Sequence, residues 1–126
     1  MTKKRLHNID SLAKGGPYSH VVEADGFLFV SGMLPVNPGK KLAITDDIRA
    51  ATELALTNVK TAVESAGSKL DEVVKVTVFL KDAADFNDMN EVYKKFFPKE
   101  PPARSCVVVK GIPGGFPIEI EAIAVK

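Results

Sequence analysis

The stretch IEIEAIA at residues 118–124 alternates glutamate with isoleucine before it becomes apolar throughout. Alternation with a period of two is typical of a β-strand with one buried face. A second stretch of strand character, PARSCV at residues 102–107, carries an arginine into an otherwise apolar run. The two stretches predict two strands near the C-terminus that hold charged side chains.

Other stretches upstream also have the composition of strands. Val73–Leu80 is almost entirely β-branched or apolar, which is typical of a strand buried on both faces. Asp25-Gly26 separates two β-rich runs and favours a tight hairpin turn. Leu34–Lys41 contains two prolines and a glycine and is predicted to be a loop. The predicted strands are Tyr18–Ala24, Phe27–Ser31, Val73–Leu80, Arg104–Lys110 and Ile118–Val125.

Two segments between these strands have helical periodicity. In Asp46–Ala66 apolar residues recur at intervals of three and four, which predicts a helix with one buried stripe. Thr45 is a candidate N-cap and Gly67 a candidate end. The second predicted helix is Asp85–Phe97, and Pro98 cannot continue it.

The predicted order is ββαβαββ in a single domain of residues 1–126, an α+β fold with a mixed sheet. Right-handed crossovers place both helices on the same face of the sheet. The other face is expected to carry apolar side chains, including Val73, Phe79, Ile123 and Val125. Since no third helix is predicted, we expect another subunit to cover this face.

Length and composition narrow the possible functions. A chain of 126 residues and 13.6 kDa has room for one modest core. Its net charge of +1 does not favour binding to nucleic acid, and no apolar run approaches the ~20 residues that span a bilayer. The single cysteine, Cys106, fits a reducing compartment, so we expect a cytoplasmic protein. The spacing of His7, His20 and Cys106 does not predict a metal site.

Arg104 and Glu119 are the clearest candidates for substrate binding and catalysis. A guanidinium offers a planar fork of donors that matches a carboxylate, and a nearby glutamate could transfer protons. On residue type alone, however, Arg104 is more typical of a surface cation. Glu119 and Glu121 have the alternation of a half-exposed strand, and Glu121 is best explained in that way. If the last two strands are neighbours, as in a hairpin, Arg104 or Cys106 lies near Glu119.

Four further residues are weaker candidates, each with a structural alternative. Tyr18 follows a Gly-Gly-Pro loop and could present its phenol to a pocket or pack as a strand-start aromatic. Ser31 could offer a hydroxyl to a ligand or bond to nearby backbone. Asn90, on the apolar stripe of the second helix, requires partners in either role. Cys106 is most simply a small buried residue, and its sequence neighbours do not favour a reactive thiolate.

Several motifs, in the right order, resemble the Rid/YjgF family of enamine/imine deaminases. They are GPYS at residues 16–19, FVSG at 29–32, MNEVY at 89–93, and the segments that contain Arg104 and Glu119. The resemblance extends over nearly the whole chain. One departure is Met33, which follows Ser31-Gly32 where the family usually has glutamine, so that an amide is missing from the end of this strand.

The resemblance implies a chorismate-mutase-like fold that assembles as a homotrimer, with sites in the clefts between subunits. It implies hydrolysis of reactive 2-imino acids, such as 2-iminopropanoate (from 2-aminoacrylate) and 2-iminobutanoate, to 2-oxo acids and ammonia without a cofactor. Pyridoxal-phosphate-dependent dehydratases release the enamine precursors. Arg104 would hold the substrate carboxylate and Glu119 would be the general base. The residues implied to line the site are Tyr18, Ser31, Asn90 and Cys106.

Two other functions remain open. The protein could be a non-catalytic module that binds small carboxylates or acts like a chaperone. It could also be a ribonuclease or translation inhibitor, a role known within the same family. A ribonuclease requires a basic groove, which the net charge of +1 and short lysine pairs do not favour.

Overall fold

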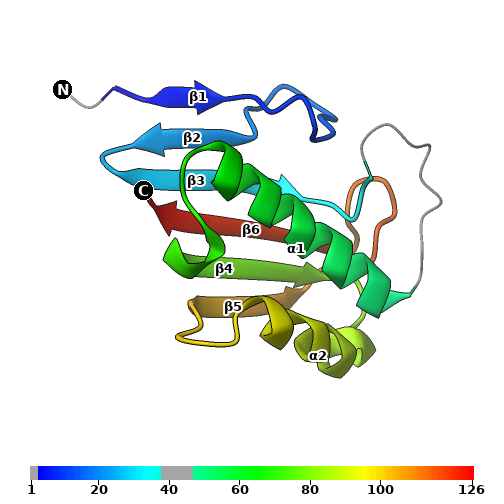
Figure 1. Ribbon diagram of the computed structural model, residues 1–126. Coiled ribbons are helices and arrows are strands. Elements are labelled where there is room, and N and C mark those ends of the chain that lie inside the picture. The colour runs from blue at the N-terminus through cyan, green and yellow to red at the C-terminus, as the bar shows by residue number, and fades with distance from the viewer. Residues whose placement is uncertain (1–2, 38–46) are drawn as a thin grey trace.

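A mixed β-sheet organises the chain (Figure 1). The computed structural model describes residues 3–37 and 47–126. Within these residues the sheet has six strands in the order β1-β2-β3-β6-β4-β5. The strands are β1 (Arg5–His7), β2 (Val21–Ala24), β3 (Phe27–Met33), β4 (Val73–Leu80), β5 (Ala103–Val108) and β6 (Ile118–Val125). Neighbours run antiparallel except β4 and β5, which are parallel.

The strand predictions are largely confirmed. β4 and β6 have the predicted bounds, and Asp25 and Gly26 form the hairpin turn with φ values of 51° and 81°. Both positive values are what the favoured two-residue hairpin turn requires. The short edge strand β1 was missed, because three residues carry too little alternation to be recognised. Tyr18 was wrongly placed in a strand, since β2 begins at Val21.

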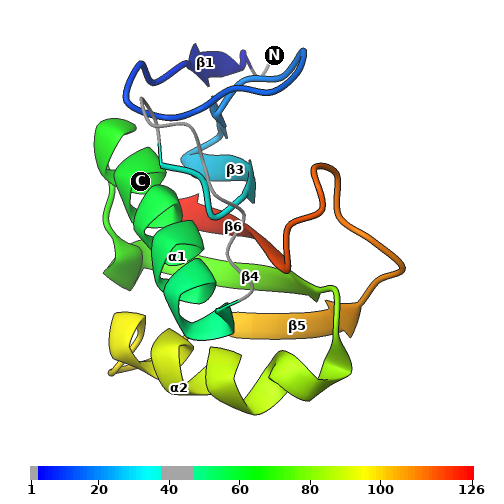
Figure 2. The same cartoon turned by 90° about the vertical axis from the view of Figure 1, so that its right-hand side faces the viewer.

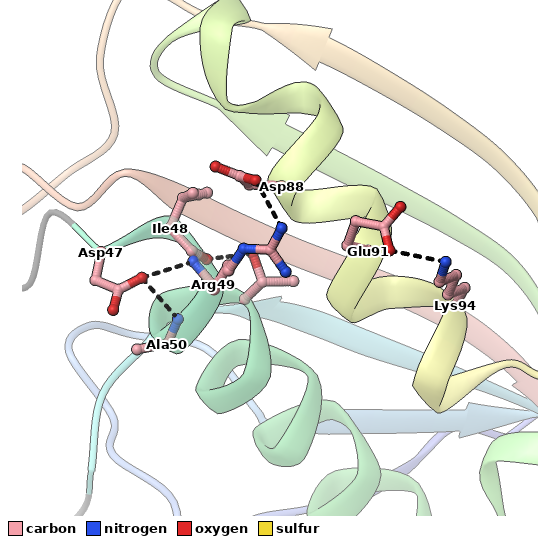
Figure 3. Close-up of polar contacts among 8 residues, drawn as sticks. Asp47, Ile48, Arg49, Ala50, Asp88, Glu91 and Lys94 are labelled. Carbon is pink, nitrogen blue, oxygen red and sulfur yellow. Dashed lines mark hydrogen bonds and ion pairs between the residues drawn. The ribbon is translucent and has the colours of Figure 1, made fainter.

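The helices are α1 (Ile48–Ser65) and α2 (Phe86–Phe96), and both cover the same face of the sheet, as predicted (Figures 1 and 2). Two short 3₁₀ turns, η1 (Leu70–Glu72) and η2 (Ala83–Asp85), precede β4 and α2. The N-cap of α1 is Asp47, whose carboxylate accepts from the backbone N–H groups of Arg49 and Ala50 (Figure 3). The proposed cap Thr45 and residues 38–41 of the predicted loop lie outside the described residues.

The hydrophobic core lies between the sheet and the two helices. Alternate residues of β4 and β6 face the helices and are fully buried, so burial follows the period of the strands. The largest fully buried side chains include Leu28, Leu56, Leu80, Met89, Ile118 and Ile120.

An ion pair on the surface links the two helices. Arg49 on α1 donates to Asp88 on α2 over 2.9 Å (Figure 3). Both partners are half-exposed, so this ion pair adds little to stability.

The open face of the sheet, opposite the helices, carries large apolar side chains. Phe27, Phe29 and Val107 are 42%, 45% and 44% exposed. The predicted apolar character of this face is therefore confirmed, with one correction. Val73 was assigned to it, but a register shift between Val73 and Lys75 turns Val73 into the core and leaves Val74 42% exposed. An extra residue at such a bulge reverses the facing of the residue before it.

The described residues contain no helix that is both long enough and apolar enough to cross a membrane.

Candidate active site

Arg104 lies on β5 and faces α2. Its strand partner is Val76, a core residue, so the guanidinium extends on the helix-covered side of the sheet. Nη1 donates to Oδ1 of Asn90 over 2.7 Å. The guanidinium carbon also lies 4.7 Å from the ring centroid of Tyr93 and 5.7 Å from that of Phe86, within the range of cation–π attraction. Contacts from α2 thus hold one edge and one face of the Arg104 guanidinium in place.

The remaining donors of Arg104 are available to a ligand. Among residues 3–37 and 47–126, its side-chain hydrogen bonds all use Nη1, and the ion pairs found there do not include it. A half-buried cation without a carboxylate partner is poorly satisfied by the protomer itself. Nη2 and Nε together have the spacing of a carboxylate. The arginine can therefore hold a small organic acid.

Cys106 and Tyr93 adjoin this arginine. Burial raises the pKa of the Cys106 thiol, and the charge of Arg104 offsets this only in part, so the thiol stays protonated at neutral pH. Burial likewise raises the pKa of Tyr93 to about 12. The structure brings Asn90, Arg104 and Cys106 together on the helix side of the sheet. The supporting aromatic side chains were recognised only as an apolar stripe, although the sole arginine of β5 was a signal that they could face a cation.

Glu119 belongs to a separate group on the open face. It lines a hollow of about 350 Å³ together with Tyr18 and Ser31. The other lining residues are Gly15, Gly32, Leu34 and Pro113. Three of the predicted site residues therefore meet in one hollow.

Hydrogen bonds give Tyr18 and Ser31 complementary capacities. The backbone N–H of Gly15 donates to the Tyr18 hydroxyl oxygen over 3.1 Å, so that hydroxyl keeps its own proton for a ligand. The Ser31 hydroxyl donates to the carbonyl of Ser19 over 2.6 Å, which leaves its oxygen free to accept. Ser31 thus makes the bond to backbone that was its structural alternative. Its side chain still lines the hollow.

His20 supports the loop that presents Tyr18. This side chain is buried; its Nδ1 accepts from the N–H of Ile9 over 2.8 Å, and its Nε2 lies 2.9 Å from the carbonyl of Ala13. These partners require a neutral ring with the proton on Nε2. This supporting role of His20 was not predicted from the sequence, because its partners come from a loop without regular structure.

The environment of Glu119 suits proton transfer. Burial raises the pKa of its carboxyl above the ordinary value, and the negative charge of Glu121 raises it further. A carboxylate that is partly desolvated is a stronger base. Glu121, which shares its strand face, is exposed.

The predicted proximity of Arg104 and Glu119 through neighbouring strands is wrong. β4 lies between β5 and β6, and the two residues extend from opposite faces of the sheet. Residues 109–117 carry the chain past the end of β4 and extend away from α1 (Figure 2). This connection exceeds the roughly 2–5 residues of a hairpin loop. A single chain therefore presents two separate groups of candidate site residues.

Comparisons with known proteins agree with this fold. Residues 8–126 match the family model described as Endoribonuclease L-PSP, which covers most of the chain. The chain belongs to this family, the YjgF/Rid family. A YjgF/Rid relative from Salmonella typhimurium, named 2-iminobutanoate/2-iminopropanoate deaminase, is 45% identical over 88% of each chain. A RutC family protein of Pyrococcus horikoshii is 46% identical over 88% of each chain.

Solved structures of the YjgF/Rid family have the same fold. The YjgF gene product of E. coli has a TM-score of 0.90 and 40% identity, with 97% of this chain and 98% of that chain covered. E. coli TdcF, solved with bound serine, has a TM-score of 0.88 and 38% identity over 97% and 98% of the two chains. The predicted α+β fold of the YjgF/Rid family is thereby confirmed.

Gly32 of this YjgF/Rid protein is a further candidate site residue, which residue chemistry alone did not single out. A Cβ at this position would lie 2.5 Å from Oε2 of Glu119 and 2.8 Å from its carboxyl carbon. Real Cβ atoms do not approach so closely, so the Glu119 carboxyl occupies space that only glycine leaves open. The signal in the sequence was a glycine inside a strand, which often marks a close approach.

We expect Gly32→Ala to move the Glu119 carboxyl and to lower turnover at the proposed site by roughly 10²-fold, the effect of a misplacement of about 1 Å. The free energy of unfolding is expected to change by less than about 1 kcal/mol, because the end of a flexible side chain yields. Steady-state kinetics and thermal melting check both. Gly111→Ala is the matched control, since nothing lies within 4 Å of a Cβ there. Equal turnover in the two variants would contradict the placement.

Proposed function

We propose that this protein hydrolyses 2-imino acids to 2-oxo acids and ammonia, in a homotrimer whose sites form between protomers. The observation that carries the proposal is the division of the site. Arg104 with Asn90 and Cys106 lies on the helix side of the sheet, while Glu119 with Tyr18 and Ser31 lies on the open side. Each group lacks what the other has, so only a second copy can complete a site.

The open face supports assembly. Its exposed phenylalanines, Phe27 and Phe29, lie 6.4 Å apart between ring centroids and are expected to bury on association. Each such side chain contributes roughly 1.5–3 kcal/mol when fully buried. A face of this kind on a small protein is typical of a subunit interface. We therefore expect sedimentation at low micromolar concentration to give about three times 13.6 kDa.

The proposed reaction uses each group for one task. Arg104 binds the substrate carboxylate and holds C2 of the imine beside Glu119. Glu119 takes a proton from water as its oxygen bonds to C2, and the proton passes to the imine-derived nitrogen. The new hydroxyl then passes its proton, through Glu119, to the nitrogen as the C–N bond breaks, so that ammonia leaves and the 2-oxo acid forms. The Tyr18 hydroxyl can donate to the developing charge, and Ser31 can accept from the attacking water.

Two comparisons support this proposal. One relative carries the name of an imine deaminase, and another was solved with serine, a small molecule that has a carboxylate. We infer that enzymes which eliminate water or ammonia from amino acids, such as pyridoxal-phosphate-dependent dehydratases, supply the substrate.

The direct test measures release of ammonia and pyruvate from 2-aminoacrylate, generated in situ by a serine dehydratase. We expect both to appear faster than by spontaneous hydrolysis, in proportion to the concentration of this protein. A rate equal to the spontaneous rate would overturn the proposed activity.

Mixed oligomers test the shared site. Arg104→Ala and Glu119→Gln subunits, each inactive alone, are expected to recover activity when refolded together. With random assembly in a cyclic trimer, about a quarter of the sites combine an intact arginine with an intact glutamate. Arg104→Ala mixed with Asn90→Ala is the matched control, since both changes lie in the same group and no site regains both residues. No recovery in the first mixture would contradict a site formed between protomers.

The description of the family as an endoribonuclease favours a second candidate, cleavage of RNA. Incubation of the same preparation with single-stranded RNA distinguishes the two. We expect no cleavage that depends on Glu119, because a net charge of +1 provides little attraction for phosphates.

A further inference from the structure

We propose that a second hollow, beside the one that contains Glu119, receives the side chain of the substrate. The preferred 2-imino acids then carry an apolar side chain longer than the methyl group of 2-iminopropanoate. This inference rests on the proposed function, because it assigns the substrate class of the same site.

The second hollow has a volume of about 260 Å³, several times the ~30 Å³ that a water molecule occupies in the liquid. Its walls are mainly apolar. They include Leu12, Met33, Leu34, Val36 and Phe116. Leu12 and Met33 are buried, so these two walls are held by the core. A lining of this kind selects apolar groups.

A buried amide fixes one wall in place. Asn58, on α1, donates through Nδ2 to the backbone carbonyls of Leu34 and Val36, each over 2.9 Å. Asn58 is itself buried and lines the hollow. A wall held by two hydrogen bonds from a helix is preorganised, which reduces the entropy lost when a ligand binds.

The two hollows adjoin, because they share four lining residues. Gly15, Tyr18, Gly32 and Leu34 line both. At Gly32 there is no side chain, and the Glu119 carboxyl lies against the space that one would fill. Since the two hollows share these residues, a substrate whose C2 lies at Glu119 can direct its side chain into the adjoining apolar hollow.

Met33 contributes to the apolar lining of this hollow. It occupies the position where the resemblance to the family leads us to expect glutamine, and its buried thioether lines the wall. An amide there would require polar partners, whereas a thioether adapts to apolar groups of varied shape. Met33 is thus the residue that favours an apolar side chain in this protein.

The test compares kcat/KM for imino acids generated by an amino-acid oxidase from alanine, 2-aminobutyrate, norvaline and leucine. We expect kcat/KM to rise along the series, by roughly 10-fold or more for the first added methylene groups. In Val36→Phe the ratio of the leucine-derived to the alanine-derived value is expected to fall at least about 10-fold. Val36→Ala is expected to preserve or raise this ratio. Thr57→Phe, at an exposed residue of α1 that lines neither hollow and lies away from the open face, is the control and is expected to leave it unchanged.

Binding of products separates failure of this inference from failure of the proposed function. By calorimetry we expect 4-methyl-2-oxopentanoate to bind more tightly than pyruvate, and Val36→Phe to remove the difference. Such binding without hydrolysis of any imino acid would overturn the proposed function and leave the assignment of the hollow standing. Hydrolysis with equal kcat/KM across the series, or a ratio unaffected by Val36→Phe, would overturn the inference alone. Neither hydrolysis nor selective binding would overturn both.

Discussion

Arg104→Ala is expected to lower kcat/KM for 2-iminopropanoate by roughly 10²–10⁴-fold, the effect of truncating one partner of a buried, hydrogen-bonded charge pair. The guanidinium is already held by Asn90 and lies over the rings of Tyr93 and Phe86, while its other donors have no carboxylate among the described residues. Its removal loses these contacts with α2 and takes away the group that binds the substrate acid. Progress curves of 2-oxo acid formation provide the measurement.

Arg104→Lys is expected to fail nearly as badly, because an ammonium group does not reproduce the two parallel donors of the fork. Arg49→Ala is the matched control. Arg49 is half-exposed and its ion pair with Asp88 lies on the outer surface of the helices, so turnover is expected to remain unchanged. Circular dichroism and sedimentation verify that each variant folds and assembles. If Arg104→Ala retains its activity, the alternative of a chaperone-like module gains support. The proposal that Arg104 binds the substrate carboxylate is then wrong.

Glu119→Gln is expected to lower kcat by roughly 10²–10⁴-fold, the contribution of a positioned general base. Glu121→Gln is the matched control on the same strand face. Its side chain is exposed and does not line the hollow, so its loss is expected to be small. The comparison distinguishes chemistry from local charge, because each variant removes one negative charge from β6. Equal losses, or a larger loss at Glu121, would show that the base is misassigned.

The pH profile gives a second signature of Glu119. Its pKa is raised by burial first and by Glu121 second, and catalysis requires the deprotonated carboxylate. Activity is therefore expected to fall as pH decreases through this raised pKa, at a higher pH than an ordinary glutamate would give. Glu121→Gln removes the second cause and is expected to shift the acid limb of kcat/KM to lower pH.

The stability of the fold depends on pH in the opposite direction from activity. Since the folded state binds the Glu119 proton more tightly than the unfolded state does, this group contributes stability as pH falls from the raised pKa toward the unfolded value. Glu119→Gln is therefore expected not to destabilise the protein at neutral pH. Thermal melting as a function of pH checks this expectation, and a lower melting temperature at pH 7 would contradict it.

Local patterns in the sequence were sufficient for most of the fold. The β-branched run of β4, the alternation in β6 and the Asp25-Gly26 turn specify their elements through short-range chemistry alone. The apolar stripes of the helices and the handedness of the crossovers placed both helices on one face. The same reasoning predicted an apolar face of the sheet that neither helix covers. Residue types and motifs also selected Arg104 and Glu119.

Only the tertiary structure decided how those residues are distributed. Strand order depends on which distant segments pair, and neither alternation nor propensity records that β4 separates β5 from β6. The bulge that turned Val73 into the core, the support of Arg104 by α2, and the approach of Gly32 to Glu119 depend on partners far away in the chain. The sequence determined by itself the elements and the reactive groups, because these follow from neighbours along the chain. The division of the site between two faces followed from long-range packing, which the sequence encodes only through the whole fold.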